Sequence, residues 1–153
     1  TQSFLELVYN EKNGRINQDA EAVGLYCNGN PVTDIVIPDG TTTVEKWFAN
    51  ITTIESIVIP DSVTKVDFNA FKGCTNLKKL TVGSGLELKG GFSSYGTNVR
   101  SFMDRWGCSG QIEEIVFSEG RTEIGQYALG EENLKSVTLP STLKRSTRLL
   151  SEM

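Results

Sequence analysis

The sequence of 153 residues contains no histidine, and this absence excludes several kinds of catalytic and metal site. Without an imidazole, the chain cannot form a Ser-His-Asp or Cys-His catalytic group or a zinc site with histidine ligands. The three cysteines, Cys27, Cys74 and Cys108, are too few for a four-cysteine zinc site or for a disulfide-dense scaffold. One internal disulfide at most can form, and the sequence leaves open whether Cys27 pairs with Cys108.

Positive charge and long apolar runs are also scarce. The chain has 15 Lys and Arg against 19 Asp and Glu, and its net charge of −4 argues against a nucleic-acid partner. No run of ~18 apolar residues is present, so we expect no membrane insertion. The glycine motif of dinucleotide-binding folds is missing, and the carboxylates lack the spacing of a calcium loop or a paired general acid. We therefore expect no enzyme activity, with no catalytic residues, no cofactor and no metal site.

What the sequence does contain is an internal repeat. Five short segments align, and their first residues are separated by intervals of 22, 23, 35 and 22 positions. Each segment alternates with period two, so its first and third residues share one face of a strand and its second residue faces the other way. The five segments are Ile35-Val36-Ile37, Ile57-Val58-Ile59, Leu80-Thr81-Val82, Ile115-Val116-Phe117 and Val137-Thr138-Leu139.

A unit of about 22 residues with one short strand cannot bury its apolar face alone, whereas stacked units share one core and one parallel sheet. Further apolar residues recur after the strands, at Val44, Val66 and Ile124. The pattern predicts an α/β-type repeat solenoid that is mainly β, a short right-handed stack with about five parallel strands. Its inward row should be Ile37, Ile59, Val82, Phe117 and Leu139.

The second copy, residues 57–77, carries the most specific motif: Ile-Val-Ile-Pro-Asp-Ser-Val-Thr-Lys-Val and then Asn-Ala-Phe-Lys-Gly-Cys-Thr-Asn-Leu. This motif resembles the BspA-like (Treponema-type) leucine-rich repeat, over about residues 33–144. The other copies are weaker, because Thr41 and Arg121 stand where the motif has Val63, and Ser146 stands where it has Val66. The resemblance implies a non-catalytic adhesion module of an extracellular or cell-surface bacterial protein. It also places Cys74 at an inward position, where we expect a buried, unreactive thiol.

We expect residues 1–153 to form a single domain with three parts. Residues 1–33 do not repeat and predict a β-hairpin cap, with strands at residues 4–9 and 21–26 and tight turns at Asn13-Gly14 and Asn28-Gly29. Residues 34–144 hold the repeats. Residues 145–153 are either a capping tail or the point at which a longer array was cut, and the start at Thr1 suggests a piece of a longer chain.

The long third interval contains an insertion at residues 84–107. Val99, Phe102, Met103 and Trp106 recur at helical spacing and predict a short amphipathic helix that faces the core, with Trp106 near the position of Phe71. The loop at residues 90–97, with Phe92 and Tyr95, is either a contact loop or a solvated spacer.

A candidate binding surface is the side of the sheet that faces away from the core. Its middle row should be Val36, Val58, Thr81, Val116 and Thr138. Lys79 and Glu114 should lie beside this row. Solenoids present such faces to partners, although β-branched residues also simply suit a pleated surface. We therefore predict a protein partner, of unknown identity, on this face or on Phe92 and Tyr95. The alternative is a structural spacer that projects another domain and has no ligand of its own.

Overall fold

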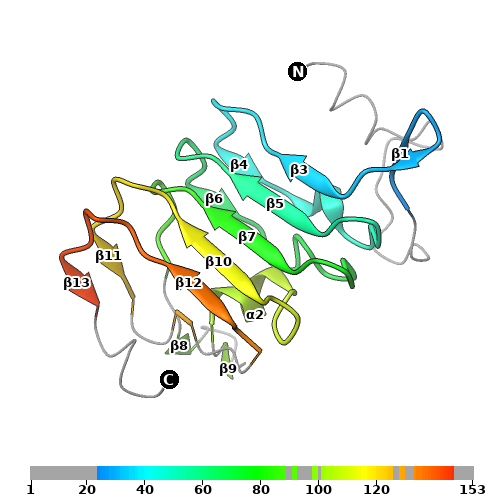
Figure 1. The fold of residues 1–153 in the computed structure, drawn as a ribbon. Helices are drawn as coiled ribbons and strands as arrows, with labels where there is room; N and C mark the ends of the chain where they lie inside the picture. Colours follow the sequence, from blue (N-terminus) through cyan, green and yellow to red (C-terminus); the bar gives the residue numbers. More distant parts are fainter. Residues whose placement is uncertain are drawn as a thin grey trace.

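The computed structural model describes residues 24–88, 91–92, 98–99, 101–125, 128–129 and 133–146. The chain winds into a solenoid in which each turn, here called a coil, contributes one strand to a common parallel sheet (Figure 1). The strands lie side by side in sequence order, which confirms the predicted fold class. The sheet consists of β3 (Asp34–Val36), β5 (Ser56–Ile59), β7 (Lys79–Val82), β10 (Glu114–Phe117) and β12 (Ser136–Thr138).

The strands pair in the register that the sequence alignment predicts. Ile35 lies opposite Ile57, Ile57 opposite Leu80, Leu80 opposite Ile115, and Ile115 opposite Val137. The strand before the 35-residue interval and the strand after it are direct neighbours, so the insertion leaves the sheet continuous. Because the register is constant, equivalent residues of successive coils form rows across the sheet.

Shorter strands follow the turns after β3, β5, β10 and β12, and they pair in parallel. β4 (Thr43–Val44) pairs with β6 (Lys65–Val66), and β11 (Glu123–Ile124) pairs with β13 (Arg145–Ser146). Val44, Val66 and Ile124 are buried in these strands, as the repeat pattern predicts. These residues supply a second apolar wall to the core.

Four of the five side chains predicted for the inward row are buried. Ile37, Ile59, Val82 and Phe117 are almost completely shielded from solvent. Leu139 occupies the equivalent position, but 38% of its surface is exposed. The prediction of a fifth buried member is therefore wrong for the described structure, because within the described residues no coil stacks beyond β12.

The insertion contains a helix that is shorter than the apolar spacing predicts. α2 (Phe102–Trp106) begins after Ser101, whose Oγ accepts a hydrogen bond from the Asp104 backbone N at 3.2 Å. Asp104 Oδ2 in turn accepts from the Ser101 backbone N at 3.1 Å, which completes a capping box and fixes the start of the helix. The spacing predicts Val99 in the helix, but Val99 lies before this cap, in β9 (Asn98–Val99), which pairs with β8 (Gly91–Phe92).

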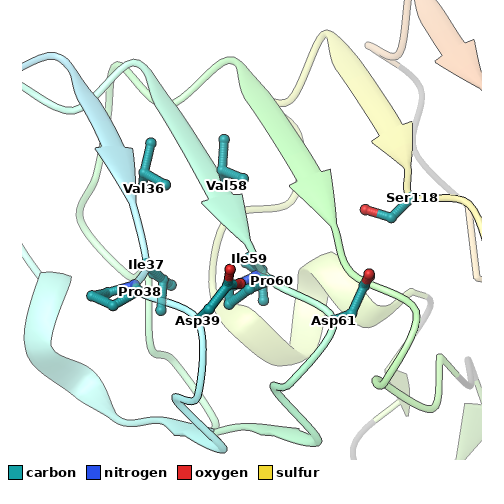
Figure 2. Close-up of a pocket in the computed structure, with 9 residues that line it drawn as sticks. All are labelled: Val36, Ile37, Pro38, Asp39, Val58, Ile59, Pro60, Asp61 and Ser118. Atoms are coloured by element: carbon teal, nitrogen blue, oxygen red, sulfur yellow. The ribbon is translucent and has the colours of Figure 1, made fainter.

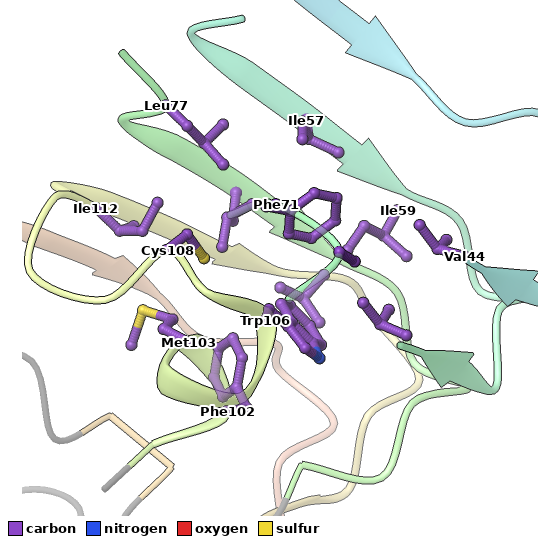
Figure 3. Close-up of a cluster of buried hydrophobic side chains, with 14 of the residues drawn as sticks. Val44, Ile57, Ile59, Phe71, Leu77, Phe102, Met103, Trp106, Cys108 and Ile112 are labelled. Carbon is purple, nitrogen blue, oxygen red and sulfur yellow. The ribbon is translucent and has the colours of Figure 1, made fainter. Parts of the chain in front are cut away.

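The apolar face of α2 packs into the core, as predicted. Phe102, Met103 and Trp106 are buried between the helix and the sheet (Figure 3). The Trp106 ring lies edge-on to the Phe71 ring, with centroids 5.9 Å apart, and Phe71 stacks on Phe48 at 6.3 Å. Trp106 thus continues an aromatic column through three successive coils.

The N-terminal segment is described only from residue 24. β1 (Tyr26–Cys27) pairs antiparallel with β2 (Asn30–Pro31) around Asn28 and Gly29, whose φ angles are 50° and 79°. The predicted Asn-Gly turn is therefore confirmed, because both central residues of a tight hairpin turn need positive φ. The predicted strand at residues 4–9 and the turn at Asn13-Gly14 lie outside the described residues. The strand predicted at residues 21–26 overlaps β1 only at Tyr26.

Candidate functional site

The outward face of the sheet assembles the predicted middle row. Val36, Val58 and Thr81 lie opposite one another on neighbouring strands, and the row continues through Val116 and Thr138. At one end of the row, 64% of the Val36 surface is exposed, and Thr138 is exposed at the other end. The three central members are half-buried against their neighbours. The structure thus brings five of the predicted residues into one surface.

The predicted pair Lys79 and Glu114 lies at the start of two adjacent strands. Lys79 Nζ is 3.0 Å from Glu114 Oε1, and both side chains are exposed. In the same row, Ser56 donates a hydrogen bond to the Asp34 carboxylate. This bond, together with one from Thr33, holds the pKa of Asp34 below its usual value. At this edge of the face, Glu114 is therefore paired with Lys79, and Asp34 stays ionised with hydroxyl groups as its partners.

A second charge network lies just before the strands, on three successive coils. Glu113 accepts hydrogen bonds from Lys135 Nζ at 2.7 Å and from Lys78 Nζ at 2.9 Å. The two lysines hold the pKa of Glu113 below its usual value. Because exposed ion pairs stabilise a fold only weakly, these contacts link the three coils but add little to the free energy of unfolding.

A hollow opens on the same face, where β3 and β5 end (Figure 2). Its volume is about 440 Å³. Val36 and Val58 form part of its wall, and the two Pro-Asp pairs that follow these strands form much of the rest. The lining residues are Val36, Ile37, Pro38, Asp39, Val58, Ile59, Pro60, Asp61 and Ser118.

The turns beside the hollow are held by hydrogen bonds between successive coils. Ser62 Oγ accepts from the Gly40 backbone N at 3.0 Å and donates to the Thr41 carbonyl oxygen at 2.8 Å. Asp61 Oδ1 accepts from the Ser84 backbone N at 2.7 Å. Each turn is thus fixed by the next one along the chain, which positions Asp61 at the edge of the hollow.

Of the residues that line the hollow, the sequence predicts Val36 and Val58 as surface residues but not Asp39 and Asp61. The sequence does distinguish these two positions, because Pro-Asp follows the strand in the first two copies, whereas Gly83-Ser84 follows it in the third. An alignment of the repeats does not by itself show that the turns of neighbouring copies meet at one edge of the sheet.

Arg121 is a buried charge close to this edge. Only 4% of its surface is exposed, and it stands where the second copy has Val63. Its Nη2 donates to the Gly83 carbonyl oxygen at 2.6 Å, and its guanidinium lies 5.8 Å from the centre of the Phe117 ring. Burial lowers the pKa of Arg121, and the nearby Asp61 carboxylate partly opposes that shift. Arg121 Nη1 donates a long hydrogen bond of 3.5 Å to the Glu123 carbonyl oxygen, and among the described residues Nε has no hydrogen-bond partner.

The structure does not describe the side chains of the other two predicted contact residues, Phe92 and Tyr95. Phe92 belongs to β8, but its side-chain placement is not described, and Tyr95 lies outside the described residues with most of the loop. The two interpretations of residues 90–97, a contact loop or a solvated spacer, stay predictions.

The cysteines carry thiols and no disulfide, so Cys27 and Cys108 are not bonded to each other. Cys74 is completely buried, as predicted, and burial raises the pKa of its thiol to about 12. In the described ranges, no three Cys, Asp or Glu side chains gather in a way that could hold a metal ion. Nor does any helix there have the length and apolar character needed to cross a membrane.

Comparison of the sequence with known families places the chain among repeat proteins. The family model of the BspA type leucine rich repeat region matches residues 22–148, in six copies. A solved structure of a leucine-rich repeat protein from Eubacterium ventriosum ATCC 27560 is similar at 19% sequence identity and a TM-score of 0.39. That similarity covers 77% of this chain and 36% of the other, so this chain spans little more than a third of that protein's structure. No curated protein matches the sequence significantly.

Proposed function

Because the chain belongs to the BspA-type leucine-rich repeat family, we propose that it is a non-catalytic module that binds a protein partner through the outward face of its sheet. Repeat modules of this kind generally act in protein interaction and adhesion, and they are commonly surface or secreted proteins of bacteria. We extend both properties to this chain as part of the proposal. The observation that carries the proposal is the in-register outward row with the hollow at one end.

The outward face of the sheet is large enough to bind part of another protein. Five strands at a spacing of ~4.8 Å give a surface about 20 Å across, which can accommodate an extended segment or the edge of a folded domain. Val36 and Val58 supply apolar area that binding would remove from water, and the charged side chains beside the row supply a polar rim.

Substitution within the row tests the proposal. Val58→Glu and Val116→Glu place a charge in the middle of the face. Phe68→Glu is the control, because it places a charge at an exposed position after β6. Binding to a panel of immobilised host and matrix proteins is measured for each variant after its fold is checked by circular dichroism. We expect at least about a tenfold loss of affinity for the two valine variants, since unpaired charges disfavour a buried interface. Equal binding by all three variants would remove the sheet face from the proposal.

A structural spacer is the second candidate. The Lys78-Glu113-Lys135 network and the hydrogen bonds between turns tie each coil to the next, as a stiff projecting element requires. A spacer would bind none of the panel proteins, and its sheet-face variants would behave like the wild type.

A further inference from the structure

We propose that the hollow at the ends of β3 and β5 binds an extended peptide segment in which a Lys or Arg side chain lies next to an aliphatic one. This inference rests on the proposed function and names the chemistry of the partner at one part of the sheet face.

The apolar half of the site is formed by neighbouring strands. Val36 and Val58 are paired residues of β3 and β5, and Figure 2 shows them side by side on the outward surface. The rings of Pro38 and Pro60 extend this wall past the ends of the strands. Because these side chains are partly exposed, an aliphatic side chain seated against them would remove apolar surface from water on both partners.

The polar half of the site is negative. Asp39 and Asp61 follow the two prolines, and both are exposed. Among the described residues, no Lys or Arg lines the hollow and no salt bridge joins either carboxylate to Lys or Arg. Asp61 interacts electrostatically with the buried Arg121 and accepts a hydrogen bond from the Ser84 backbone N. Asp39 lies in the preceding coil and is exposed to solvent. The site therefore complements a positive side chain.

The same features argue against other occupants. Phosphate-bearing ligands would be repelled by the two carboxylates. The described residues hold no cluster of three ligating side chains, so a bare metal ion is not favoured either. In an extended peptide, consecutive side chains point to opposite sides, and the side chains of residues i and i+2 lie on the same side, about 7 Å apart. One of these two side chains can therefore reach the valines while the other reaches a carboxylate.

The test uses a random heptapeptide display library, selected on the folded protein. Selected peptides are synthesised with a fluorescent label and titrated with the wild type, Asp39→Asn, Asp39→Asn/Asp61→Asn and Val58→Glu. Glu55→Gln serves as a matched control, because Glu55 is an exposed carboxylate just before β5, at the other end of that strand. Asn preserves the shape of Asp and can still accept the Ser84 hydrogen bond, so these variants should fold.

We expect the selected peptides to share a Lys or Arg close to Val, Ile or Leu. The double Asn variant should bind them at least about tenfold more weakly, Asp39→Asn alone should show part of that loss, and Glu55→Gln should bind normally. Raising the salt concentration should weaken binding to the wild type. These results together would support the inference.

Two other results would overturn it, and they are distinguishable. Peptides that depend on Val58 but carry no basic residue, or that bind the Asn variants normally, would refute the inference and leave the proposed function standing. Peptides whose binding is unaffected by Val58→Glu would show that the sheet face is not the binding surface, and the proposed function would fail as well.

Discussion

Cys74 in the second coil donates a hydrogen bond from its Sγ to the backbone carbonyl oxygen of Phe48 in the first coil, at 2.9 Å. The thiol is completely buried, and loss of hydration raises its pKa from 9.0 to about 12, with a small opposing effect from the Ile51 backbone. A side chain that occupies an inward position of the repeat thus also joins two coils.

Burial of the Cys74 thiol predicts a specific loss of stability at alkaline pH. Because the folded-state pKa lies above the unfolded one, folding favours the neutral thiol, and its contribution is complete below pH 9. That contribution is lost as the pH rises towards 12, at up to about 1.4 kcal/mol per pH unit. Urea unfolding measured from pH 8 to 11 should therefore show a steeper fall in the free energy of unfolding for the wild type than for Cys74→Ala. Parallel slopes would contradict this assignment.

The three thiols should also differ in their reactivity. Cys27 is half-buried in β1, whereas Cys74 and Cys108 are completely buried. A thiol-specific reagent at pH 8 should label Cys27 alone in the native protein and reach the other two only after denaturant is added. Mass spectrometry of the labelled peptides identifies the sites, and rapid native labelling of Cys74 would refute its buried position.

The aromatic column provides a test of the core. Phe71 touches both Phe48 and Trp106, so Phe71→Ala should remove contacts in three coils and lower the free energy of unfolding by about 3–5 kcal/mol. Phe68→Ala is a matched control three positions away, because Phe68 is exposed and should cost less than about 0.5 kcal/mol. Chemical denaturation of both variants measures the difference. Equal costs would mean that Phe71 does not belong to the core.

We expect that only glycine fits at position 83 without loss of stability, because the preceding coil lies too close for a side chain. A Cβ at this position would lie 2.3 Å from the Pro60 carbonyl oxygen and 2.6 Å from the Asp61 backbone N. Gly83→Ala should therefore separate the second and third coils and cost about 3 kcal/mol or more. Gly40→Ala is the control, since Gly40 has a φ of +88° but open space around it, and backbone strain alone should cost about 1 kcal/mol. Thermal unfolding ranks the two variants, and the reverse order would refute the close approach.

Arg121 predicts an unusual response to an apolar substitution. Its guanidinium is buried with one short bond to the Gly83 carbonyl and one long bond to the Glu123 carbonyl, and Nε has no partner among the described residues, so burial of its charge is poorly compensated. Arg121→Met keeps most of the volume and should leave stability unchanged or raise it by about 1 kcal/mol. Arg121→Ala, which also leaves a cavity, should be clearly destabilising. A large loss in the Met variant would instead show that the hydrogen bond to Gly83 is essential.

The sheet could be predicted from the sequence because two regularities reinforce each other. The alternation in Ile57-Val58-Ile59 defines which side chains point inward, and the repeated interval defines which residues become neighbours. A parallel register with equivalent residues in rows then follows, and it is the register observed.

Other features depend on contacts that alternation does not encode. The start of α2 is fixed by the reciprocal bonds of Ser101 and Asp104, so Val99 falls outside the helix despite its helical spacing. The hollow depends on turns from different copies meeting in space, which is why Asp39 and Asp61 were missed while Val36 and Val58 were not. The exposure of Leu139 reflects its place at the end of the described stack and not its residue type.

The unequal interval between β7 and β10 has a mechanical consequence. In a stack whose coils touch only their neighbours, a pulling force applied along the chain would detach the coils one after another. Most detachment events would release a similar length of polypeptide, whereas the coil with the inserted α2 would release a distinctly longer one. A force-extension trace of this protein would therefore carry an internal marker of how far unravelling has progressed.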